Sequence, residues 1–407
     1  MKSYLTLVLI TLLLPLSAFA QSESAQLEAL SKEVQRLKES LVIPEDDTKK
    51  SHFGLGPAAS KVYGAKKGVS IGGYGEFYMG HYLGNKDERS AHRGDMYRWI
   101  QYLGYKFSDN LILNSEIEIE HADEVFVEFS YLDWLISDCA NIRAGLMLMP
   151  IGIVNEMHEP TTYHGNMRPE TERTIIPSTW REMGVGLHGA LGAGIDYKLY
   201  LVGGLNGADF DSKGVRGGRQ KGSKFSFEDK GVAGRLDWSP SNAIQLGASA
   251  YYGGADQDPT GTVNINNFVA EAHGIFKFQN AELRALYAQS QINGANKVST
   301  LAGEDVTVPK TQNGYYVTAA YNLMPALGSE KFNALIPFAR FEQLNLQAAM
   351  TGDAESDASL ESTEITAGLE FKPHADVVYK LEYSTKSNAV KDSNATQEIR
   401  FGAGFIY

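Results

Sequence analysis

The chain has 407 residues, with 49 acidic and 37 basic side chains and a formal net charge of −12. This balance disfavours a nucleic-acid partner, because proteins that bind phosphate backbones generally present an excess of lysine and arginine. Cys139 is the only cysteine, so no disulfide can form within the chain. Glycine (41), tyrosine (21) and phenylalanine (18) are abundant, which favours strands and tight turns.

Residues 1–20 have the pattern of a secretory signal peptide. Lys2 gives a positive start, residues 5–14 are an apolar run, and Ala18-Phe19-Ala20 supplies the small residues of a cleavage site before Gln21. The run is short for a membrane helix, and a retained N-terminal anchor is the alternative interpretation. No later window of about 18 apolar residues follows, which excludes a helical membrane protein. We therefore expect the chain to be exported.

Residues 21–42 are expected to form a short periplasmic coiled-coil helix. Apolar residues recur alternately three and four positions apart, which is the spacing of a coiled-coil seam. They are Leu27, Leu30, Val34, Leu37 and Leu41. An amphipathic helix lying on a surface is the alternative, because the pattern covers fewer heptads than a coiled coil usually has. Residues 43–68 are predicted to be a linker.

From Val69 to the C-terminus, apolar and polar residues alternate with a period of two, which predicts strands. In the final segment, for example, Ile399, Phe401 and Phe405 share one face. We expect sixteen strands. They lie near residues 69–80, 95–107, 110–121, 124–135, 140–148, 181–189, 194–203, 230–238, 242–253, 266–278, 281–291, 313–323, 334–343, 362–371, 376–385 and 397–407.

Short and long connections alternate between these segments. The long ones mostly follow odd-numbered strands, at 81–94, 149–180, 204–229, 254–265, 292–312, 344–361 and 386–396. An antiparallel barrel with short periplasmic turns and long outer loops has this alternation. We therefore predict an all-β fold, a 16-stranded antiparallel transmembrane β-barrel over residues 69–407 in the bacterial outer membrane. A soluble all-β domain is the alternative.

Aromatic residues are expected near the strand ends, where they would form girdles at the membrane–water interfaces. They are Tyr97, Trp99, Tyr105, Phe107, Phe129, Trp134, Trp238, Tyr251, Tyr252, Phe276, Phe278, Tyr315 and Tyr316.

The strand faces opposite the apolar ones carry charges of both signs, and sixteen strands leave room for an aqueous lumen. Any single charge could instead pair across strands and stiffen the wall.

The connection at 149–180 is the longest, and we expect it to fold inward and narrow the pore. A loop packed over the barrel mouth is the alternative. Glu156, His158, Arg168 and Arg173 are its candidate constriction residues, because selectivity follows the groups at a constriction.

Residues 152–155 and the segment Ile175-Ile176-Pro177-Ser178-Thr179-Trp180-Arg181-Glu182-Met183-Gly184 resemble the phosphate-selective porins O and P family. In that family a loop of this kind leads through an I-P-S-x-W-R-E-like segment into the next strand. The N-terminal helix, the sixteen strands and the terminal aromatic Tyr407 are also similar. The similarity of organisation covers residues 21–407, whereas the motif covers only about residues 152–186.

The resemblance implies a homotrimer in which each protomer has its own pore, with a constriction rich in arginine and lysine that binds anions. Here the positions that would take this role are Arg98, Arg143, Arg168, Arg173 and Arg181. The chain departs from the family in being acidic overall and in mixing glutamate with arginine in the loop. The ion preference is therefore left open.

The sequence predicts a passive porin for small hydrophilic solutes or ions, with outer-membrane lipid around it and an anion or phosphate preference as one option. The alternative is a structural anchor that tethers the envelope through the N-terminal helix. We expect no enzyme activity, since Ser178 lacks a G-x-S-x-G elbow, and no cofactor. His158 and His164 show no repeated metal-ligand spacing, so no metal is expected.

Overall fold

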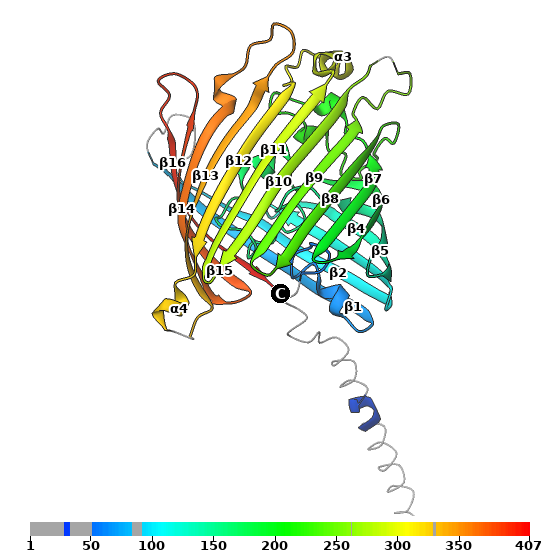
Figure 1. Cartoon of the computed structure of the whole chain (residues 1–407), viewed down its shortest axis with the longest axis vertical. Coiled ribbons are helices and arrows are strands. Elements are labelled where there is room, and N and C mark those ends of the chain that lie inside the picture. The colour runs from blue at the N-terminus through cyan, green and yellow to red at the C-terminus, as the bar shows by residue number, and fades with distance from the viewer. Residues whose placement is uncertain (1–27, 33–50, 84–91, 262, 329–330) are drawn as a thin grey trace, which may run out of the picture.

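The computed structural model describes residues 28–32, 51–83, 92–261, 263–328 and 331–407 (Figure 1). Its strands close into a single antiparallel barrel in which β1 pairs with both β2 and β16. The strands are β1 (Gly68–Leu83), β2 (His92–Ser108), β3 (Leu111–Glu120), β4 (Glu124–Ser137), β5 (Ala140–Leu148), β6 (Arg181–Gly192), β7 (Ile195–Gly203), β8 (Lys230–Ser241), β9 (Ile244–Gly254), β10 (Asn266–Phe278), β11 (Ala281–Asn293), β12 (Thr311–Tyr321), β13 (Ala334–Ala349), β14 (Glu361–His374), β15 (Val377–Asn388) and β16 (Thr396–Ile406).

All sixteen predicted strands form, and the predicted barrel is confirmed. Short helical pieces lie between them: α2 (Lys61–Gly64), η1 (Thr171–Ile175), η2 (Gly207–Asp209), η3 (Arg216–Gly218), η4 (Ala295–Lys297), α3 (Val298–Ala302), α4 (Met324–Leu327) and η5 (Ala358–Leu360). Figure 1 shows the C-terminus and α4 at the end with the short turns, opposite α3. Among the described helices, none has the length and apolar character needed to cross a bilayer.

The alternation along each strand separates an apolar outside from a polar inside. In β16 the side chains of Ile399 and Phe401 are exposed. The side chains of Glu398 and Arg400, which alternate with them along the strand, are buried inside the barrel. Lipid requires apolar side chains on the outer surface of a barrel. It also requires a closed sheet, because closure leaves no strand edge with unpaired backbone groups.

Three of the aromatic residues expected in the girdles are instead buried inside the barrel: Phe129, Tyr251 and Tyr316. Their neighbours Tyr252 and Tyr315 face outward, as the alternation requires. Phe129 points inward because the register between β3 and β4 shifts beside it, so that Glu128 and Phe129 are buried in succession. A bulge of this kind cannot be read from a simple period of two.

The predicted linker is wrong over its described part. Residues 51–65 fold inside the barrel, and the side chains of Leu55, Ala58, Val62 and Tyr63 are buried there. Of the predicted coiled coil, residues 28–32 are helical, with an exposed Lys32–Glu28 ion pair of 2.8 Å. The remainder of that prediction, and the predicted signal peptide, lie outside the described residues.

Candidate functional site

The connection between β5 and β6, residues 149–180, lies within the barrel, and we call it the inward loop. Its apolar side chains are buried, among them Met149, Ile151, Ile176 and Trp180. The Trp180 ring packs edge-on against Tyr251 of the wall, with ring centroids 4.7 Å apart. The loop therefore brings an apolar core into the barrel and does not rest over its mouth.

Wall carboxylates accept hydrogen bonds from the backbone N–H groups of the inward loop. Glu342 of β13 accepts from the amides of Glu170 (3.0 Å) and Thr171 (2.6 Å). Glu370 of β14 accepts from Gly165 at 3.1 Å, and Glu382 of β15 accepts from Asn166 at 2.8 Å. Buried backbone amides need such partners, so these acidic residues hold the loop in place.

Wall cations bind the carbonyl groups of the same loop. Lys380 of β15 donates to the carbonyls of Tyr163 (3.0 Å) and Gly165 (2.7 Å). Arg340 of β13 donates to the carbonyls of His164 (3.2 Å) and Met167 (3.3 Å). Much of the charge that the sequence places on the lumen face is thus used to anchor the loop.

Three of the predicted anion-binding arginines are neutralised by buried carboxylates. Arg98 lies 3.2 Å from both Glu118 and Glu120 and 3.5 Å from Glu76. Arg143 pairs with Asp133 at 2.7 Å.

The third of these predicted anion-binding arginines, Arg181, pairs with Glu128 at 2.5 Å. In these contacts the guanidinium charge is compensated by the wall, so the expected anion-binding role of Arg98, Arg143 and Arg181 has no support from the geometry.

Two further predicted residues are also paired. Glu156 accepts from Lys198 of β7 at 2.5 Å. His158 donates from Nδ1 to the Asn155 carbonyl (2.9 Å), and its Nε2 lies 3.3 Å from the Glu116 carboxylate. Although burial lowers it, the neighbouring Glu116 carboxylate raises the pKa of His158 to about 9. The Glu116 side chain therefore favours the protonated form of His158.

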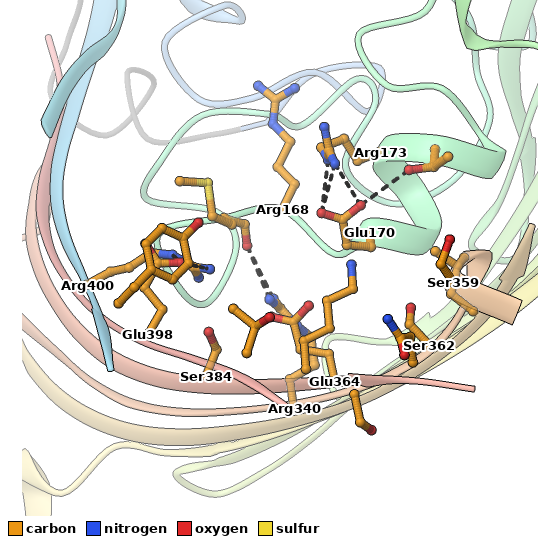
Figure 2. A pocket seen from close by; sticks show the side chains of 18 of the residues that line it. Arg168, Glu170, Arg173, Arg340, Ser359, Ser362, Glu364, Ser384, Glu398 and Arg400 are labelled. Atoms are coloured by element: carbon orange, nitrogen blue, oxygen red, sulfur yellow. Dashed lines mark hydrogen bonds and ion pairs between the residues drawn. The ribbon is translucent and has the colours of Figure 1, made fainter. Parts of the chain in front are cut away.

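Arg168 and Arg173 lie together at a cavity of about 730 Å³, which we call the vestibule. In Figure 2 these arginines lie on the inward loop, and Ser362 and Ser384 lie on strands across the cavity. Arg173 pairs with Glu170 at 2.8 Å. The Arg168 side chain donates only to the His158 carbonyl, at 3.4 Å, and its Nε has no protein partner among the described residues.

Cations outnumber carboxylates among the unpaired groups of the vestibule. Arg93 and Arg400 share Glu398, and His121 is bound to Asp95. Within the described chain, four lining cations form no ion pair, whereas two lining carboxylates have no lysine or arginine partner: Glu364, and Asp95, which contacts His121. The four cations are Arg168, Lys213, Arg340 and Lys386.

A second cationic group lies behind the loop on residues 204–229, where sequence reasoning placed only an outer connection. Arg216 donates to the carbonyls of Arg173 and Ser178, both at 2.5 Å, and Arg219 donates to the Pro177 carbonyl at 2.9 Å. Burial and the neighbouring arginines lower the pKa of Arg216 to about 9. Such crowding of cations raises the local positive potential.

The sequence pattern predicts only some of these cations to point into the lumen. Arg340 follows the alternation of its strand, which places it in the lumen. Arg216 and Arg219 lie in an irregular connection where no period predicts direction.

No family model matches the chain. An uncharacterised protein of Aquifex aeolicus (strain VF5) is 35% identical over 378 residues, which cover 88% of this chain and 84% of that protein.

Solved structures of outer-membrane porins share the fold. The anion-selective porin from Comamonas acidovorans aligns with a TM-score of 0.57 at 9% identity, covering 83% of this chain and 99% of its own. A Salmonella typhi OmpF complex with daunomycin gives 0.55 at 13% identity, with 84% and 98% covered. The outer membrane channel DcaP of Acinetobacter baumannii gives 0.54 at 10%, with 83% and 97% covered. At these identities the likeness is one of fold, a porin barrel.

Proposed function

This chain belongs to the same family as the Aquifex aeolicus protein, and we propose that it is a porin of the bacterial outer membrane. It would let small hydrophilic solutes or ions diffuse passively and would catalyse no reaction. The closed barrel with an apolar exterior and a charged interior supports this function, because lipid requires the first feature and water-soluble solutes the second.

The proposed channel prefers anions. The observation that carries this preference is the excess of unpaired cations around the vestibule, four against two carboxylates without a lysine or arginine partner among the described lining residues. Charged groups at close quarters in a narrow lumen set which ion enters, whereas charges compensated by the wall contribute little. The net charge of the whole chain does not oppose this, because wall carboxylates such as Glu370 and Glu382 form ion pairs with Lys380 and Arg400. Phosphate is one candidate anion, from the sequence resemblance.

The reversal potential of the purified protein in a planar bilayer under a KCl gradient tests the preference. The wild type is expected to show the sign of anion selectivity, and Arg168→Gln with Arg340→Gln should move the potential toward zero. Lys277→Gln with Lys297→Gln is the matched control, since it removes two positive charges from exposed positions outside the vestibule. A cation-selective wild type, or equal shifts in the double variant and the control, would contradict the preference.

We also propose a homotrimer with outer-membrane lipid around its perimeter, in line with the sequence resemblance. Chemical cross-linking of the protein in detergent tests this assembly. The expected pattern is bands up to three chains, and a single-chain band alone would contradict it.

A structural envelope anchor is the second candidate. It is favoured by the filling of the barrel interior, where the inward loop is fixed to the wall by Glu342, Glu370, Lys380 and others. Folded protein that never conducts would support the anchor over the channel.

A further inference from the structure

Residues 51–65 form a compact segment inside the barrel at the end where the chain terminates. The ideal Cβ position on Gly72 of β1 lies 3.1 Å from both the Ala58 carbonyl oxygen and the Tyr407 carbonyl oxygen. Figure 1 places the C-terminus at the end with the short turns, which face the periplasm in barrels of this class. We call residues 51–65 the floor segment.

The barrel wall is shaped to hold the floor segment. Tyr63 donates to Asp133 of β4 at 2.7 Å and accepts from Arg143 of β5 at 3.2 Å. A Cβ on Gly104 of β2 would lie 2.5 Å from Cγ2 of Val62, so the absence of a side chain there is what admits Val62. These are buried, directional contacts of the kind that fix one position for the segment.

The floor segment is also joined to the inward loop. Glu159 of that loop is buried, and its two carboxylate oxygens accept from the backbone N–H groups of Ala58 (3.1 Å) and Ala59 (2.9 Å). On the other side, Asn114 of β3 donates to the Ala59 carbonyl at 2.9 Å. The turn at Ala58 and Ala59 is therefore held between the loop and the wall.

We propose that the floor segment is a second restriction of the pore, in series with the inward loop, and that Glu159 is the positioning residue that joins the two. This inference rests on the proposed channel function. A solute that leaves the vestibule toward the periplasm has to pass both elements. Because the two elements lie in series, their resistances to the current add, and the narrower element contributes more.

Single-channel conductance of two N-terminal deletions tests the proposal. A chain lacking residues 21–67 loses the floor segment, and its conductance is expected to rise by about twofold or more. The matched control lacks residues 21–50 and keeps the floor segment, so its conductance should equal that of the wild type. Equal conductance in all three proteins would overturn the inference while leaving the channel function intact. Absence of conductance in all three would overturn the channel function itself.

Thiol labelling gives a second readout that does not require the larger deletion to fold. In a Cys139→Ser background, Ala59→Cys is expected to react slowly with a water-soluble maleimide, because Ala59 is buried. Adding Glu159→Gln replaces one of the two oxygens that accept from the Ala58 and Ala59 amides with an NH2 donor, and labelling should become about tenfold faster or more. Lys66→Cys, exposed just beyond the segment, is the control and should react at the same rate with either residue at 159. An unchanged rate at position 59 would overturn the role of Glu159.

Discussion

Glu172 of the inward loop allows a sharp test of how its burial affects stability. Its side chain is fully buried, with Oε1 accepting from the Tyr316 hydroxyl (2.5 Å) and Oε2 from the Val154 amide (2.6 Å). Burial raises the pKa of Glu172 from 4.5 to about 7. The folded state therefore holds a proton on this group over a pH range in which the unfolded chain has released it.

The sign of the pH effect follows from that difference. Because the pKa of Glu172 is higher in the folded state, its contribution to stability is fully present below about pH 4.5 and is lost as the pH rises through about 7. At 1.36 kcal/mol per pKa unit, the change amounts to about 3 kcal/mol. Glu172→Gln, which resembles the protonated acid, should thus be more stable than the wild type at about pH 8 by up to that amount.

Urea unfolding in detergent, followed by tryptophan fluorescence, measures the free energy of unfolding of both proteins at about pH 5 and about pH 8. Other titrating groups are common to both proteins and cancel in the difference between them. The account predicts a difference near zero at the lower pH and a more stable variant at the higher pH. A variant less stable than the wild type by the same amount at both pH values would refute the reasoning.

Three further outcomes are expected. Arg143→Ala leaves Asp133 buried without its guanidinium partner and should lower the free energy of unfolding by about 3–5 kcal/mol, and an unchanged urea midpoint would be inconsistent with a buried pair. Arg340→Gln should lower the anion-to-cation permeability ratio measured from the reversal potential, and a constant ratio would exclude it from the selectivity element. In Gly104→Val the new side chain would overlap Val62 and should lower the free energy of unfolding by about 1–3 kcal/mol. An unchanged free energy of unfolding would show that Val62 of the floor segment is not packed against β2.

The strands could be predicted because a transmembrane barrel imposes one rule on every strand. Ile399 and Phe401 face lipid, and Glu398 and Arg400 face inward, so the period of two is visible along the chain. The exceptions arise where geometry departs locally from that rule. At Glu128 and Phe129 the register shift buries two consecutive residues, and the alternation alone assigns one of them to the wrong side.

The site was less predictable, because the partner of an inward charge comes from elsewhere in the chain. The alternation puts both Arg98 and Arg340 inside the barrel. Only the fold shows that Arg98 meets three carboxylates, whereas Arg340 meets the carbonyls of the inward loop. The floor segment was missed for a similar reason. Its turn-rich sequence resembles a linker, and it is ordered by distant groups such as Glu159 and Asn114.

The most direct test of the central claim is the current through a planar bilayer that contains the purified, folded wild-type protein with KCl on both sides at unequal concentration. The account predicts stepwise, passive conductance whose reversal potential has the sign of anion preference. Protein that inserts as a folded barrel and yet gives no current steps would contradict the claim.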